Sequence, residues 1–202
     1  DGLHKLGFCG LRSAVKIDDI VGPVSNPALY KRVGNHLPVG ADGQKRDKDR
    51  ILSTPTDDAE WNKTLSGRLQ ELLQGGVAVG LEAGEVTTMN GIESKATSGY
   101  NESIMEWQEK DQLPHQDESR ADMQVPDQGK GCSCMVAVMA DTRLCLRTLG
   151  GIWVVIVLQP GDLLVWRGDV CHHGLGYMRR NVRVHCHLYP AGFRPTETGL
   201  IH

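Results

Sequence analysis

The stretch LQPGDLLVWRGDVCHHGLGY at residues 158–177, followed by NVRVHCHLYP at residues 181–190, decides how this chain of 202 residues folds. A short apolar run at 163–167 lies between the turns Pro160-Gly161 and Gly168-Asp169, which is typical of a strand in an antiparallel sheet. In the second stretch four apolar residues alternate with three basic ones, Val182, Val184, Cys186 and Leu188 against Arg183, His185 and His187. Because successive side chains of a strand point to opposite faces, this predicts one apolar face and one cationic face.

Similar short apolar runs occur on both sides of these stretches. We expect strands at residues 77–81, 85–89, 103–108, 132–140, 143–147, 152–159, 162–167 and 182–188. The connections after residue 131 are too short for the helical crossovers of a parallel sheet. The sequence therefore predicts a mainly β fold with flanking helices, either an antiparallel sandwich or a jelly roll.

The first 100 residues follow a different pattern. Asn26-Pro27 before residues 28–33 predicts a short helix, and the polar residues 40–52 predict a surface loop. A longer helix is expected after Thr56, because apolar residues recur there at helical spacing, namely Trp61, Leu65, Leu69 and Leu72. We expect a single domain over residues 1–202, with a helical and irregular support region at 1–100, a jelly-roll core at 101–190 and a C-terminal tail at 191–202.

Composition excludes several classes of protein. The net charge of −3 gives no support to a broad nucleic-acid-binding surface. The longest strongly apolar run, residues 152–158, is far shorter than the roughly 20 residues of a membrane helix. The six cysteines form no zinc-knuckle spacing, and we expect buried thiols in a reducing compartment. These features favour a soluble intracellular protein, and the start at Asp1 rather than Met leaves the compartment open.

The segment His115-Gln116-Asp117, with its imidazole and its carboxylate, is the first candidate for metal binding. In an extended segment, residues two apart point the same way, so an imidazole and a carboxylate can bind one cation. The segment Cys171-His172-His173-Gly174 can supply a second imidazole. Two His and one carboxylate, with open positions opposite, form the arrangement of non-haem Fe(II) oxygen chemistry, although zinc also accepts such ligands.

Arg183 is the candidate clamp for a ligand carboxylate. Its planar guanidinium binds a carboxylate through two hydrogen bonds and keeps its charge. The cationic face that it shares with His185 and His187 suits the wall of a polar cavity. The alternative is an exposed edge strand with solvated side chains.

Together these elements resemble the iron(II)/2-oxoglutarate-dependent dioxygenase superfamily. The family pattern is His-x-Asp, a long gap, a distal His, and an Arg or Lys about ten residues later; here Arg183 follows His172 by 11 positions. The stretches quoted above, with CMVAVMADTRLCLR at 134–147, are similar to the phytanoyl-CoA-hydroxylase-like and algal or protist branch. The resemblance covers about residues 103–190, and the Arg departs from the Lys of the prolyl-4-hydroxylase pattern.

The resemblance implies a double-stranded β-helix (jelly-roll) fold and a set of residue roles. Fe(II) would be held by His115, Asp117 and His172, and the far carboxylate of the cosubstrate 2-oxoglutarate by Arg183. The family motif Gly-Asp-x-x-His-x-Gly favours His172, with His173 as the alternative metal ligand. The implied cavity is lined by His185, His187, Trp107 and Tyr177, and the loop at 118–131 is a candidate lid.

Two alternatives remain open at the sequence level. One is a non-catalytic jelly-roll subunit of a larger assembly. The other is a cupin-like metal enzyme that does not use 2-oxoglutarate. The sequence does not identify the substrate, whether a small molecule or a protein.

Overall fold

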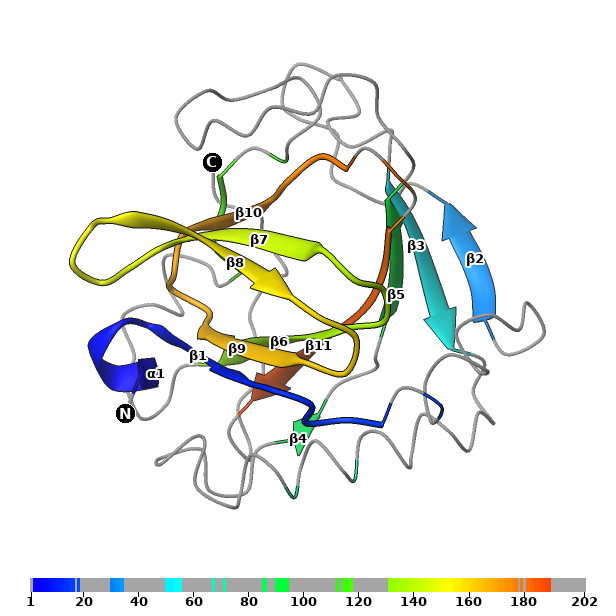
Figure 1. The fold of residues 1–202 in the computed structure, drawn as a ribbon, viewed down its shortest axis with the longest axis horizontal. Coiled ribbons are helices and arrows are strands. Elements are labelled where there is room, and N and C mark those ends of the chain that lie inside the picture. The colour runs from blue at the N-terminus through cyan, green and yellow to red at the C-terminus, as the bar shows by residue number, and fades with distance from the viewer. Residues whose placement is uncertain are drawn as a thin grey trace.

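The structure is a computed structural model of the chain, in which antiparallel β-sheets dominate (Figure 1). It describes residues 2–16, 18, 30–34, 50–55, 67, 71, 85–86, 90–94, 112, 114–117, 131–177, 179 and 181–189.

One short helix and eleven strands lie wholly within the described residues. The helix is α1 (Gly2–Lys5), and the early strands are β1 (Phe8–Leu11), β2 (Tyr30–Gly34), β3 (Arg50–Pro55), β4 (Glu85–Val86) and β5 (Asn90–Ser94). The later strands are β6 (Cys132–Ala137), β7 (Thr142–Arg147), β8 (Trp153–Leu158), β9 (Leu163–Arg167), β10 (His172–Gly174) and β11 (Asn181–Tyr189).

The strands form two sheets. The larger has the order β1-β9-β6-β11-β5-β3-β2, with β4 also paired to β11, and the smaller has the order β10-β7-β8. A cluster of apolar side chains fills the space between them: Met135, Ala137, Leu164 and Trp166 from the large sheet, and Leu144, Leu146, Val154 and Ile156 from the small one. Two antiparallel sheets packed face to face confirm the predicted mainly β fold.

Five of the predicted strands, at 132–140, 143–147, 152–159, 162–167 and 182–188, correspond to β6, β7, β8, β9 and β11, and β4 lies within the one predicted at 85–89. The turn at Pro160-Gly161 is also present, and Gly161 has a φ of +85°, a conformation that favours glycine. The strands predicted at 77–81 and 103–108 lie outside the described residues. So does the apolar stripe of the helix predicted after Thr56, within which Gly67 and Glu71 are helical.

Two predictions for the first half are wrong. The short helix expected at 28–33 overlaps strand β2, and residues 50–52 of the expected surface loop belong to β3. Strand β2 pairs with β3, and β3 pairs with β5, so the bonds that fix these segments come from residues distant in the sequence. Such tertiary pairing overrides weak local preferences. The first 100 residues thus contribute strands β1 to β5 to the large sheet.

The six cysteines are thiols rather than disulfides, as expected. Cys134 and Cys186 lie directly opposite each other on β6 and β11, on the face turned away from the small sheet. A hydrogen bond with Cys186, together with burial, raises the pKa of Cys134 well above its ordinary value. A buried thiol of this kind is unreactive and acts as a small apolar core residue.

Asp162 anchors the turn between β8 and β9. It is 2% exposed, and its carboxylate accepts hydrogen bonds from the backbone N–H groups of Gln159 and Ser13, each at 2.9 Å. The guanidinium of Arg12 donates to the same carboxylate at 2.5 Å. Burial acts to raise the pKa of Asp162, but these donors outweigh it, so the pKa lies below its ordinary value.

We expect Asp162→Asn to lower the free energy of unfolding by about 1–3 kcal/mol near neutral pH, because a buried donor loses its acceptor. The folded-state pKa is depressed, so the carboxylate stabilises the fold fully above the unfolded pKa of about 3.9, and this contribution is lost as pH falls through the folded value. The difference between the native chain and the variant should therefore shrink toward about pH 3. Urea unfolding followed by circular dichroism measures both effects.

Asp141→Asn is the matched control. Its side chain is 56% exposed, and its φ of 61° is one that Asn tolerates well. We expect a change within about 0.5 kcal/mol. Equal losses in the two variants would contradict the role given to Asp162.

Candidate metal centre

Backbone pairing brings the His115-Gln116-Asp117 segment next to the start of β10. The N–H of His115 donates to the carbonyl of His172 at 2.9 Å, and the N–H of His172 donates back at 2.8 Å. The N–H of Asp117 donates to the carbonyl of Gly168 at 3.2 Å. Residues 57 positions apart are therefore held side by side by main-chain hydrogen bonds.

The side chains of His115, Asp117 and His172 converge. His172 Nε2 lies 3.5 Å from Asp117 Oδ2, and His115 Nε2 lies 4.0 Å from Asp117 Oδ1. One nitrogen from each imidazole and one carboxylate oxygen all lie within 4.8 Å of one another. His115 and His172 are 9% and 3% exposed. With metal–ligand bonds of about 2.0–2.2 Å, one cation can reach all three donors after small side-chain movements.

The structure distinguishes His172 from its neighbour. His172 Nδ1 lies 3.0 Å from the carbonyl of Val170, so it carries the proton and donates, which leaves the Nε2 lone pair facing Asp117. His173 is the next residue of the strand and points to the opposite face, where its ring lies 5.7 Å from that of Trp153. His172 therefore lies in the candidate centre, and His173, the alternative ligand, does not.

Asp117 lies among four imidazoles and the hydroxyl of Ser133. Burial acts to raise its pKa, but the imidazoles of His172, His187, His185 and His115 outweigh this and hold the pKa below its ordinary value. The Ser133 hydroxyl donates a hydrogen bond to Asp117 Oδ2. Asp117 is therefore ionised, as a metal ligand must be.

Ser133 is a member of the site that the sequence did not suggest. It is fully buried in the otherwise apolar strand β6, directly opposite His187 on β11. Its oxygen lies 3.1 Å from His187 Nδ1. Because a hydroxyl has a single proton and Ser133 gives it to Asp117, His187 Nδ1 is the donor in this contact. An inward-facing serine in a run of Cys, Met and Val was the signal available in the sequence.

Strand β11 has the two faces that its alternation predicts. Val182, Val184 and Cys186 are buried on the face turned away from the small sheet. Arg183, His185 and His187 share the other face, opposite Ala137, Met135 and Ser133 of β6. Burial, and then the neighbouring His187, lower the pKa of His185 to about 3, so this imidazole is neutral near pH 7.

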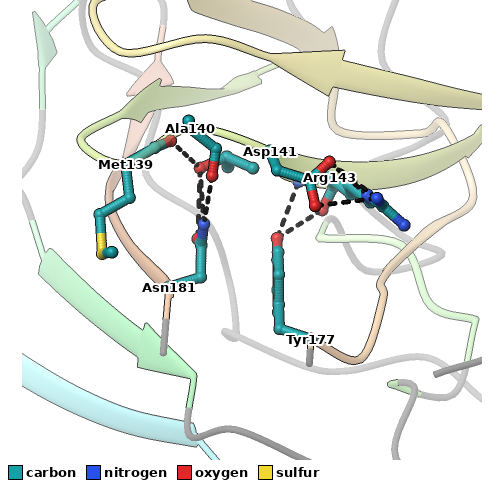
Figure 2. A network of polar contacts seen from close by, with 7 residues as sticks. Met139, Ala140, Asp141, Arg143, Tyr177 and Asn181 are labelled. Carbon is teal, nitrogen blue, oxygen red and sulfur yellow. Dashed lines mark hydrogen bonds and ion pairs between the residues drawn. The ribbon is translucent and has the colours of Figure 1, made fainter. Parts of the chain in front are cut away.

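Arg183 is buried, with 2% exposure, and its guanidinium lies over the ring of Tyr177 at 5.7 Å. The Tyr177 hydroxyl in turn accepts a hydrogen bond from the N–H of Arg143 and donates one to its carbonyl, at 2.8 and 3.0 Å. Figure 2 shows both contacts. A ring held in this way keeps one face against the guanidinium, a favourable cation–π contact.

Asn181, at the start of β11, is held by a second group of polar contacts in Figure 2. Its amide nitrogen donates to the carbonyl of Ala140 at 3.3 Å and to the hydroxyl of Thr142 at 3.1 Å. The Thr142 hydroxyl also donates to the carbonyl of Met139 at 2.8 Å. These contacts fix the start of β11 against the turn between β6 and β7, and with it the position of Arg183.

Two sequence predictions for the site fall elsewhere. Trp107, a predicted cavity residue, lies outside the described residues, and so do residues 118–130 of the candidate lid. No helix within the described ranges is long and apolar enough to cross a membrane.

The sequence matches no protein-family model, and no curated protein matches it either. Solved structures do match. A prolyl hydroxylase from Trichoplax adhaerens, in complex with a hypoxia inducible factor peptide fragment, has a TM-score of 0.68 at 14% identity over 94% of this chain and 86% of its own. A prolyl-4-hydroxylase from Pseudomonas putida has a TM-score of 0.61 at 14% identity over 95% and 97%. HygX from Streptomyces hygroscopicus, with nickel and 2-oxoglutarate bound, has a TM-score of 0.66 at 10% identity over 96% and 87%.

Two of these neighbours are prolyl hydroxylases, and the third binds nickel and 2-oxoglutarate. Their fold is the jelly roll. At 10–14% identity the similarity establishes the fold, which is the predicted one. The phytanoyl-CoA-hydroxylase-like branch is not among the neighbours described above.

We expect Asp117→Asn to weaken the binding of Co(II), used as a probe for Fe(II), by more than about 100-fold, because a neutral amide is a poor replacement for a charged ligand. Isothermal titration calorimetry under anaerobic conditions measures the affinity. Asp169→Asn is the control, since the Asp169 side chain is also 12% exposed but pairs with Arg167. Unchanged Co(II) binding in Asp117→Asn would rule this carboxylate out as a ligand.

Proposed function

We propose that the protein is an Fe(II)- and 2-oxoglutarate-dependent dioxygenase that hydroxylates a C–H bond of its substrate. The observation that carries the proposal is the convergence of His115, Asp117 and His172 within 4.8 Å, in the fold of such oxygenases. The donor set fits Fe(II): two imidazoles and one ionised carboxylate. Bound Fe(II) would supply the activation of dioxygen, in which one oxygen atom enters the substrate and the other enters succinate as 2-oxoglutarate loses carbon dioxide.

The residues of β11 support a cosubstrate role for Arg183. It lies on the same face as His185, two residues away, which is about 7 Å along the strand. A diacid with one end at the cation could therefore place its far carboxylate at Arg183. A buried guanidinium binds such a carboxylate through two charge-assisted hydrogen bonds. His185, His187 and Tyr177 would form the wall around the cosubstrate.

The protein's other contributions are orientation and exclusion of water. The Val170 carbonyl sets the tautomer of His172, and Ser133 holds one oxygen of Asp117. The apolar cluster around Trp166 would exclude water from one side of the site. The centre of the Trp166 ring lies 5.1 Å from that of His172 and 5.6 Å from that of His185. On the quoted sequence stretches, we place the protein in the phytanoyl-CoA-hydroxylase-like or algal and protist branch.

The four imidazoles around Asp117 favour one second candidate, a cupin-like metal enzyme that does not use 2-oxoglutarate. The two candidates differ in what Arg183 does. In the dioxygenase this residue binds the cosubstrate, and in the second candidate it does not.

The anaerobically loaded Fe(II) protein, when exposed to air with 2-oxoglutarate, should release succinate slowly even without substrate. We expect His172→Ala to abolish this release, because the cation loses a ligand, whereas His173→Ala should keep at least half of it. Succinate is measured by chromatography and mass spectrometry. Absence of succinate from folded, Fe(II)-loaded native protein would instead support a non-catalytic jelly-roll subunit.

Arg183→Met should raise the KM for 2-oxoglutarate more than about tenfold, because removing one partner of a buried charge pair costs roughly 2–5 kcal/mol. Co(II) affinity should change little, since Arg183 is not a ligand. Arg143→Met is the control, because the Arg143 side chain pairs with Asp141 on the other sheet. An unchanged KM in Arg183→Met would favour the cupin-like candidate.

A further inference from the structure

Asp117 belongs to a second group of three potential ligands. One carboxylate oxygen of Asp117 and one ring nitrogen each from His185 and His187 lie within 4.8 Å of one another. His185 and His187 are two residues apart on β11 and point the same way, as His115 and Asp117 do on their own segment. The rings of His185 and His187 are 4.9 Å apart. The carboxylate therefore lies between two pairs of imidazoles.

His185 and His187 can each offer a ring nitrogen to a cation. His185 offers one ring nitrogen within 4.8 Å of the donor atoms of Asp117 and His187. His187 donates through Nδ1 to Ser133, which places its lone pair on Nε2. Neutral imidazoles and an ionised carboxylate are ligands for Zn(II), Co(II), Ni(II) and Fe(II).

Charge argues against filling both groups at once. Two divalent cations would bring four positive charges to a buried region whose two ligand groups contain a single carboxylate and which also holds Arg183. Uncompensated charges in a protein interior carry a large desolvation cost. A single cation is compatible with either group, because Asp117 is common to both.

We propose that Asp117, His185 and His187 form a second position for one divalent cation, which shares Asp117 with the His115/His172 position and excludes a cation there. The second position lies on β11, the strand of Arg183, and so on the side of the site assigned to the cosubstrate. A cation there is in a non-productive place, because the ligands of the first position no longer surround it.

The test is Co(II) binding by the full chain in the absence of 2-oxoglutarate, which makes it independent of the proposed catalytic function. The native protein should bind one equivalent. His115→Ala/His172→Ala and His185→Ala/His187→Ala should each still bind one equivalent, because each keeps one complete group. The crossed variant His172→Ala/His187→Ala keeps only one imidazole in each group, and its affinity should fall at least about 100-fold below that of the other two.

The absorption bands of bound Co(II) give a second readout. The bands should differ between His115→Ala/His172→Ala and His185→Ala/His187→Ala, because different ligands remain in each variant. The control His173→Ala should leave both the stoichiometry and the spectrum unchanged. Circular dichroism checks folding, and the same three double variants made with Gln replace any Ala variant that does not fold.

The proposal is overturned if His115→Ala/His172→Ala binds Co(II) no better than the crossed variant. Two equivalents in the native protein would overturn mutual exclusion. If the protein releases no succinate but shows the binding pattern above, the proposed dioxygenase function is wrong and the second cation position is still supported.

Discussion

The site depends on one buried negative charge. Asp117 accepts a hydrogen bond from Ser133 and lies among four imidazoles, and its pKa lies below the ordinary value despite its burial. A carboxylate in such surroundings is stable only if neighbouring groups compensate it, and here those groups come from β6, β10, β11 and the segment of Asp117 itself. Each of these segments must therefore be placed accurately before the site exists.

Main-chain hydrogen bonds provide that accuracy. The reciprocal pair between His115 and His172 fixes two ligands through the backbone, and the ladder between β6 and β11 sets Ser133 opposite His187. The apolar cluster between the sheets then holds the strands that carry the polar residues. Arrangements built on strands are more precise than arrangements built on loops, and the candidate ligands on β10 and β11 benefit from this.

The sequence predicted the second half of the fold well, because period-two alternation and turns such as Pro160-Gly161 and Gly168-Asp169 are local signals. It also predicted the faces of β11 and the meeting of His115, Asp117 and His172. It failed for β2 and β3, whose hydrogen bonds come from strands far along the chain. It missed Ser133 because a single serine in an apolar strand has no meaning until its cross-strand neighbour is known. It also gave no sign that Asp117 would lie close to His185 and His187, since that proximity depends on the packing of two separate segments.

Tyr177 joins the two layers of the sandwich in a way that affects Arg183. Its hydroxyl is held by both backbone groups of Arg143 at the beginning of the small sheet, while its ring supports a guanidinium that belongs to the large sheet. The spacing between the layers is therefore transmitted to the tilt of this guanidinium. A bulky core substitution that widens the sandwich would therefore act on Arg183 through Tyr177, and so on the residue to which the cosubstrate role is assigned.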